Sequence, residues 1–190
     1  MSLRPLSFIP LSAVVGRRVR SATGADLGRL VDVIARSHGD TYPPLSGLIV
    51  RVRRRPVRVP IDAVAQLEPD GVTVSAVSMR FGDVVRGPGE TLLVEDLVDH
   101  QVVDADGARV VRVADLYLSD LASGARLVGI DVSLQALVRR LAPLRRRGPV
   151  RRERVIDWAA LQPIDAPGGP LRLRRRDDAD RPRQSHRIDT

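Results

Sequence analysis

The chain has no cysteine among its 190 residues and is poor in several other residue types. The lack of cysteine excludes disulfides, thiolate metal sites and cysteine nucleophiles, and it is compatible with the cytoplasmic location that we expect. Lysine is absent too, so all 31 basic residues are arginines. Aromatic residues make up only 3% of the chain. The core must therefore be built from Val, Leu, Ile and Ala, and the abundance of valine favours strands over helices.

Long apolar runs are also missing. No window approaches the roughly 18 uninterrupted apolar residues of a membrane span. Residues 1–10 lack the apolar stretch and the small-residue cleavage site of a signal peptide. With 43% hydrophobic residues, the sequence predicts a soluble, folded chain. Its length suits one medium domain or two small ones.

Positive charge is concentrated in two places. The formal net charge is +8, of which residues 134–154 contribute +7, from eight arginines against Glu153, and residues 171–190 contribute +3. The rest of the chain is left at -2. A smaller cluster consists of Arg51, Arg53, Arg54, Arg55 and Arg58, and acidic residues elsewhere in the chain balance its charge. Exclusive use of arginine indicates a coding bias, which makes the high isoelectric point weak evidence for a nucleic-acid partner.

Short β-strands are the main pattern in the first half. Alternating or continuous β-branched residues, interrupted by Gly, Asp and Pro, are typical of strands in a sandwich or barrel. We expect a turn at residues 22–24 and a loop at residues 37–44. The expected strands cover residues 17–21, 28–35, 46–53, 56–60 and 71–75.

The second half repeats the first. Residues 15–24 align with residues 98–107 at an offset of 83, as does Asp32 with Asp115. The closing element recurs at an offset of 97, where Trp158 stands in the place of Ile61. The larger offset predicts an insertion after Ser133, and that insertion is the arginine-rich segment. Within it, apolar residues spaced as on one helix face fit a short amphipathic helix, with a long hairpin as the alternative.

These patterns divide the chain into four parts. We predict a first barrel, a connector, a second barrel that carries the insertion 134–154, and a disordered or linker tail without apolar periodicity. The predicted bounds are 10–78, 79–91, 92–165 and 166–190.

The motifs of both halves resemble those of the PRC-barrel, a small β-barrel found in the H subunit of the photosynthetic reaction centre and in a ribosome maturation factor. In the first half they read Gly-Arg-Leu-Val-Asp-Val at 28–33, Gly-Leu-Ile-Val at 47–50 and Val-Pro-Ile-Asp-Ala-Val at 59–64. The tandem arrangement, with Met-Arg-Phe at 79–81 and Val-Ile-Asp-Trp at 155–158, is similar to the N-terminal region of bacterial MgtE-type magnesium transporters. The likeness spans about residues 10–165.

This resemblance implies an all-β fold of two small PRC-type β-barrels in tandem. It also implies a regulatory or adaptor module that binds a protein partner, as the accessory N-terminal part of a magnesium-transport system. The partner would be an acidic protein surface or the downstream helical and CBS domains of that system. It transfers no metal ligand, because the magnesium-sensing acids of the family belong to those other domains.

Catalytic residue types are not grouped in a way that predicts an enzyme. His38, His100 and His186 are scattered, which disfavours a zinc cluster or a histidine-based triad. Asp104 and Asp106 flank a turn but lack the remaining ligands of a calcium loop. We therefore expect no catalytic site, cofactor or metal.

Asp32 and Asp115 occupy equivalent positions of the two copies. We interpret both as structural carboxylates that accept hydrogen bonds at the same bend of each barrel, with a duplicated functional site as the alternative.

The arginine-rich segment is the candidate partner-binding site. Guanidinium groups make bidentate contacts to carboxylate or phosphate, so they fit an acidic protein face, RNA or an anionic membrane. Scarce aromatic residues disfavour RNA, which leaves an RNA- or ribosome-associated factor as the alternative function. The residues expected to contact the partner are Arg139, Arg140, Arg145, Arg146, Arg147, Arg151 and Arg152.

Overall fold

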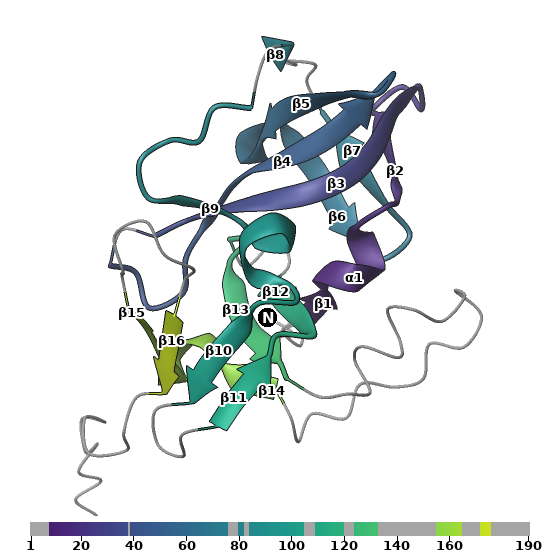
Figure 1. The fold of residues 1–190 in the computed structure, drawn as a ribbon. Helices are drawn as coiled ribbons and strands as arrows, with labels where there is room; N and C mark the ends of the chain where they lie inside the picture. The colour runs from purple at the N-terminus through teal and green to yellow at the C-terminus, as the bar shows by residue number, and fades with distance from the viewer. Residues whose placement is uncertain are drawn as a thin grey trace, which may run out of the picture.

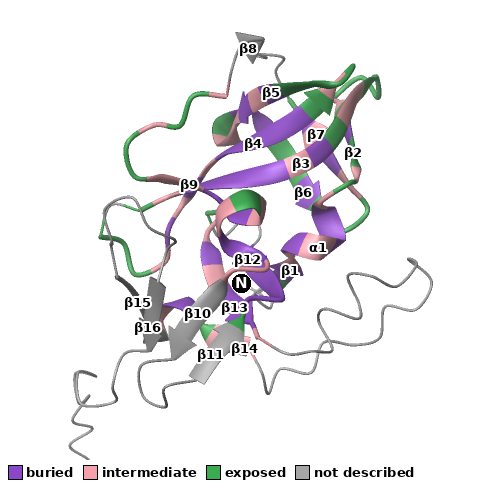
Figure 2. Ribbon diagram, viewed as in Figure 1, coloured by how far each residue is buried: buried purple, intermediate pink, exposed green. Residues whose placement is uncertain are grey.

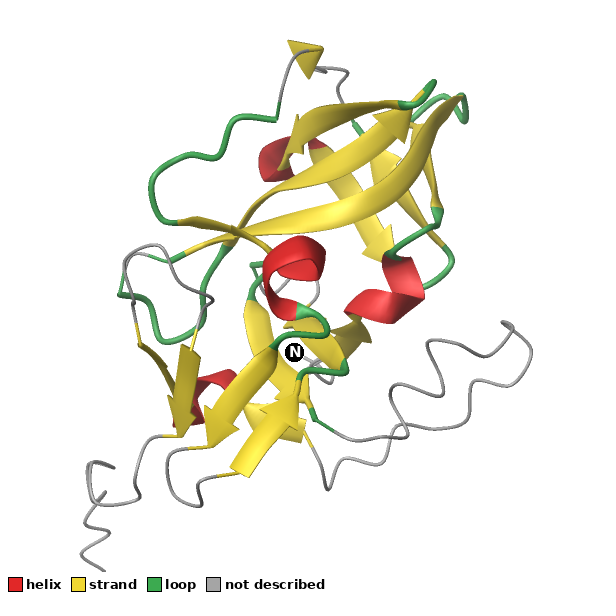
Figure 3. Ribbon diagram, viewed as in Figure 1, coloured by secondary structure: helices red, strands yellow, loops and turns green. Residues whose placement is uncertain are grey.

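The computed structural model describes residues 8–37, 39–75, 80–81, 84–104, 109–119, 124–132, 155–164 and 172–175. This part of the chain is mostly β, which confirms the predicted all-β class (Figure 3). The helical elements of the described residues are single turns of three to five residues.

The first repeat contains the five expected strands. The structure adds a strand and a helical turn in front of them, a strand over residues 64–68 and a short strand at residues 80–81. In chain order the elements of this repeat are β1 (Phe8–Pro10), α1 (Leu11–Val14), β2 (Arg18–Ser21), β3 (Asp26–Arg36), β4 (Leu45–Val52), β5 (Arg55–Pro60), η1 (Ile61–Ala63), β6 (Val64–Glu68), β7 (Gly71–Val74) and β8 (Arg80–Phe81).

The second repeat starts inside the segment that the sequence assigns to the connector. Its elements are β9 (Glu90–Leu92), η2 (Leu93–Leu97), β10 (Gln101–Asp104), β11 (Arg109–Arg112), β12 (Asp115–Ser119), β13 (Leu127–Asp131), β14 (Val155–Asp157), η6 (Trp158–Ala160), β15 (Leu161–Ile164) and β16 (Arg172–Arg175).

The two repeats match element by element at the offsets that the sequence shows. Strand β10 lies 83 residues after β2, and β11 and β12 together cover the positions equivalent to β3. Turn η6 follows η1 by 97 residues. Backbone hydrogen bonds recur as well: the N–H of Gly16 donates to Leu30 over 2.8 Å, and that of Asp99 donates to Val113 over 2.9 Å. Gly16 and Asp99 also share a left-handed conformation, with φ of 82° and 68°.

The strands form two main sheets and two hairpins. The larger sheet has eight strands, ordered β6-β7-β2-β3-β4-β5-β8 with β9 beside β3, and it curls around its core (Figure 1). The smaller has the order β1-β12-β13-β14, while β10 pairs with β11 and β15 with β16. Within the described residues, β6 and β8 are the edge strands of the larger sheet and do not pair with each other. This sheet therefore does not close into a barrel.

Each repeat places its leading strand on the sheet of the other repeat. Strand β1 pairs with β12 of the second repeat, and β9, the leading strand of the second repeat, pairs with β3 of the first. The helical turns follow their strands, so that α1 packs against β12 and η2 against β3. We call this arrangement the reciprocal exchange.

One aliphatic core runs through both repeats (Figure 2). Leu30 and Leu48 of the first repeat belong to the same buried cluster as Leu116 and Ile130 of the second. Their four side chains are 0% exposed. The prediction of a core built from aliphatic residues is therefore confirmed.

Within the predicted tail, residues Arg172–Arg175 form β16, which pairs antiparallel with β15. The backbone N–H and C=O groups of β15 need partners, and a charged segment supplies them as well as an apolar one does. The other tail residues from 176 on lie outside the described residues.

Candidate functional site

The predicted partner-binding arginines, Arg139 to Arg152, lie outside the described residues, as does the helix or hairpin expected there. His38 and His186 lie outside them too, whereas His100 follows η2. Within the described ranges no three His, Cys, Asp or Glu side chains could hold a metal ion together.

Asp32 holds the exchanged turn η2 on the first sheet. Its carboxylate accepts backbone hydrogen bonds from Val94 and Glu95 of that turn, at 2.8 and 3.0 Å, and from Val33 at 2.7 Å. Burial raises the pKa of Asp32, while the N–H donors of Val94, Val33 and Glu95 oppose that rise. The carboxylate accepts backbone hydrogen bonds, as the structural interpretation predicts, and in this way it caps a helical turn that the sequence did not predict.

Asp115 does the same for the other exchanged turn. Its Oδ1 accepts from the backbone of Ser12 in α1 at 3.0 Å and from Leu116 at 2.9 Å, and its Oδ2 accepts from the Ser12 hydroxyl. A second buried carboxylate, Asp131, lies directly opposite Asp115 on β13 and accepts from the Tyr117 hydroxyl. The repeat does not reveal Asp131, because the equivalent residue of the first repeat, Ile49, is apolar.

Glu90 ties β9 to three strands of the larger sheet. Its carboxylate is 1% exposed and accepts from Arg36 on β3, Ser46 on β4 and Arg58 on β5. Arg58 donates twice, over 2.7 and 2.6 Å, and the N–H of Gly87 adds a further bond of 2.8 Å. These donors, Arg58 foremost, hold the pKa of Glu90 far below its ordinary value. The sequence assigns Glu90 to a connector, with no indication that it is buried.

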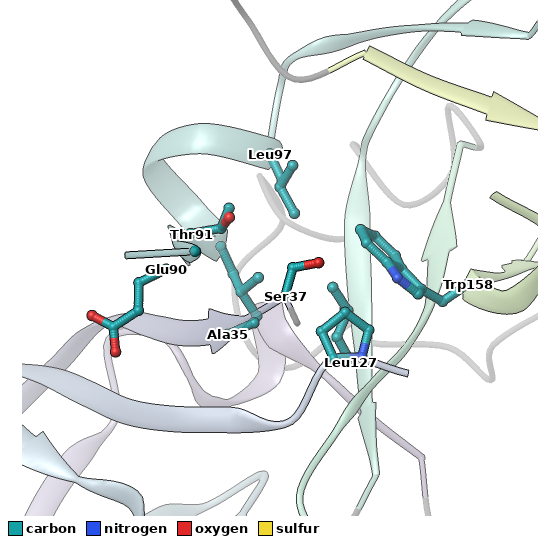
Figure 4. A pocket seen from close by; sticks show the side chains of 10 residues that line it. Ala35, Ser37, Glu90, Thr91, Leu97, Leu127 and Trp158 are labelled. Carbon is teal, nitrogen blue, oxygen red and sulfur yellow. The ribbon is translucent and has the colours of Figure 1, made fainter. Parts of the chain in front are cut away.

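A cavity of about 220 Å³ lies beside Glu90, between the two repeats (Figure 4). Its walls come from β3, β9, η2, β13 and η6, and Trp158 closes one side. The Glu90 carboxylate points away from the cavity, toward the larger sheet (Figure 4). The residues that line the cavity are Ala35, Ser37, Pro43, Gly89, Glu90, Thr91, Leu93, Leu97, Leu127 and Trp158.

This cavity suits packing better than catalysis. It is smaller than the 300–1,000 Å³ of typical ligand sites. Of the residues that line it, only Glu90 is ionisable, and its carboxylate is directed away from the hydroxyls of Ser37 and Thr91. The buried Asp32 and Asp115 are occupied as caps. Trp158 is 7% exposed and belongs to the shared core.

The smaller arginine cluster of the first repeat separates into two groups. Arg58 points to Glu90, whereas Arg51, Arg53, Arg54 and Arg55 are exposed at the hairpin between β4 and β5. The sequence offers no sign of that separation beyond the alternation of the strand.

No protein-family model matches the chain, and no curated protein matches it in sequence. Among the described residues, no helix is long and apolar enough to cross a membrane.

Proposed function

We propose that this chain is a noncatalytic docking module, a tandem PRC-type protein that serves a magnesium-transport system of the MgtE type as a regulatory or adaptor part. It acts in the cytoplasm by binding a protein partner. The family assignment rests on the sequence motifs of the two repeats.

The reciprocal exchange is the observation that supports this proposal best. Because β1 and β9 each complete the sheet of the other repeat, the two repeats form one body with a shared core. Such a body presents surfaces of both repeats in a fixed relation, which lowers the ordering cost of binding a partner.

The contacts of the buried acidic side chains also support docking rather than catalysis. Asp32, Asp115 and Glu90 are engaged with the backbone or with arginines of the exchanged elements. A catalytic acid or base needs access to a substrate as well as a shifted pKa. Asp32, Asp115 and Glu90 lack that access, because they are buried and their carboxylates hold the exchanged elements in place.

The partner follows from the resemblance and from charge. The helical cytoplasmic domain of an MgtE-type transporter is the expected partner, and an acidic face on it would complement a chain of net charge +8. Binding would be measured by calorimetry with the purified full chain and that domain from the same genome. We expect saturable binding in the micromolar range, weaker at high salt. A helical domain of equal net charge from an unrelated protein is the control, and equal binding of both would refute the proposal.

Binding of RNA through the arginine-rich segment is the alternative function. Its affinity would fall steeply between low and physiological salt, and neutralising Arg145, Arg146 and Arg147 would flatten that slope. Absence of RNA binding at low salt would eliminate this alternative.

A further inference from the structure

Three adjacent strands of the larger sheet carry arginines at directly opposed positions. Arg18 on β2 lies opposite Arg29 on β3, and Arg29 lies opposite Arg51 on β4. Opposed residues of neighbouring strands project from the same face, with their Cβ atoms about 4.5–5.5 Å apart. Arg54 of the following hairpin joins the three around a hollow of about 430 Å³. We call these four residues the arginine row.

The arginine row is only partly neutralised by the chain itself. Arg18 forms an ion pair with Asp26, and Arg29 donates to the carbonyl oxygen of Gly16 over 2.8 Å. Arg51 and Arg54 have no hydrogen-bond or ion-pair partner in the part of the chain that the structure describes. Like charges at directly opposed positions destabilise a sheet, so the row is unfavourable for folding unless an anion binds it.

Backbone strain lies at the same place. Arg53 and Arg54 form the two-residue turn between β4 and β5 with φ of 46° and 72°, a conformation that Asn and Gly adopt far more readily. Gly28, which also lines the hollow, has φ of 137°, and a Cβ there would lie 2.3 Å from the Arg51 carbonyl oxygen. A biased composition explains scattered arginines, but it does not explain arginines placed against both charge repulsion and turn preference.

We infer that the arginine row is the docking site for one acidic face of a helix in the partner protein. This inference deepens the proposed function and rests on it. Neighbouring strands are about 4.8 Å apart, and carboxylates three or four residues apart on a helix are about 5–6 Å apart, so successive glutamates meet successive arginines. Within the chain itself, the carboxylate of Asp26 already pairs with Arg18 of the row. Among the residues that line the hollow there is no aromatic ring to stack on a base, which favours carboxylates over nucleic acid.

The test uses the full chain and a stapled helical peptide with glutamates at i, i+4, i+7 and i+11 on one face. A peptide of the same composition, with the glutamates distributed around the helix, is the matched probe. Binding is followed by fluorescence anisotropy at low and physiological salt. We expect the one-faced peptide to bind more tightly, and the double variant R29Q/R51Q to weaken that binding about tenfold.

The control variant is R112Q, which removes one positive charge at an exposed position of the second repeat. It should weaken binding less than twofold. Similar losses in R112Q and R29Q/R51Q would show attraction by net charge alone and would overturn the inference. Absence of peptide binding, or tighter binding of an RNA or DNA strand that depends on Arg29 and Arg51, would overturn it as well.

Two further measurements distinguish a failure of the inferred docking site from a structural role of Arg51 and from a failure of the proposed function. Removing the opposed charge in R51Q should leave the melting temperature unchanged or raise it, whereas a drop would assign Arg51 a structural role instead. If the transporter's helical domain does not bind the wild-type chain, the proposed function fails. If it binds R29Q/R51Q and wild type equally, only the docking site inferred here fails.

Discussion

Replacing Glu90 by glutamine removes the charge that holds β9 on the larger sheet while leaving the size of the side chain unchanged. Glu90 accepts five hydrogen bonds, two of them from Arg58 and one from Arg36. An amide has one acceptor oxygen, so its NH₂ group must face a donor. The change therefore tests whether the exchanged strand depends on this buried carboxylate.

The expected cost follows from the exposure of the partners. Breaking a fully buried ion pair costs about 3–5 kcal/mol. The side chains of Arg58 and Arg36 are 27% and 42% exposed, so water solvates part of the guanidinium charge that loses its partner in this variant. We expect E90Q to lower the free energy of unfolding by about 2–3 kcal/mol.

Urea unfolding followed by the fluorescence of Trp158, the single tryptophan, measures this loss. With a urea dependence of about 2–3 kcal/mol per M, the midpoint should fall by about 1 M. The control is E95Q, because the Glu95 side chain is 66% exposed and, among the described residues, its carboxylate pairs only with Arg86. We expect it to cost less than about 0.5 kcal/mol. Equal costs for E90Q and E95Q would refute the assigned role of Glu90.

The pH dependence gives an independent check on Glu90. Its pKa is lower in the folded state than the ordinary value of 4.5, so the unfolded chain takes up the proton first on acidification. The stability that Glu90 contributes is thus complete above pH 4.5 and is lost as the pH falls toward the folded pKa. The difference between wild type and E90Q should narrow from pH 6 to pH 3, and a constant difference would contradict this account.

Three further substitutions test the caps and the close contact of β3 with β4. Asp32→Asn should lower the free energy of unfolding by about 1–3 kcal/mol at pH 7, because its NH₂ group meets a backbone N–H of η2. Burial raises the pKa of Asp32, so the folded state takes up the proton first and wild type should gain stability over D32N on acidification; unfolding of both proteins at pH 7 and pH 4 decides this. Asp115→Asn should cost a similar amount, and a loss below 0.5 kcal/mol by urea unfolding would contradict its capping of α1. Gly28→Ala should lower the melting temperature far more than Gly24→Ala, since a Cβ at Gly24 meets nothing within 4 Å; equal shifts would show that β3 and β4 separate easily.

The strands and the repeat could be predicted from the sequence because both leave local patterns. The alternating valines of β5 and β7 have the period of two that a half-buried strand requires. The spacing of 83 residues between the repeats can be recognised in the sequence, because a repeated fold needs apolar residues and turns at repeated positions. Asp32 and Asp115 could be paired by that offset, and their shared position suggested a structural role.

The reciprocal exchange could not be predicted, because it concerns which strands pair and not which residues form strands. Residues 8–10 and Glu90–Leu92 are each three residues long, too short to show a period. Glu90 follows a Gly-Pro-Gly sequence that is typical of an exposed connector. Its burial depends on Arg36, Ser46 and Arg58, which lie 32 to 54 positions away in the chain.

The exchange also changes what a domain boundary means in this chain. A cut in the connector at 79–91 leaves β1 and α1 attached to the first repeat, although they complete the sheet of the second. The same cut leaves β9 and η2 with the second repeat, although Asp32 and Glu90 hold them on the first. Each half would then expose an unpaired strand edge and lose the cap of a helical turn. We therefore expect the two repeats to unfold as one cooperative unit, so that a partner that binds one of them acts on a body that includes both.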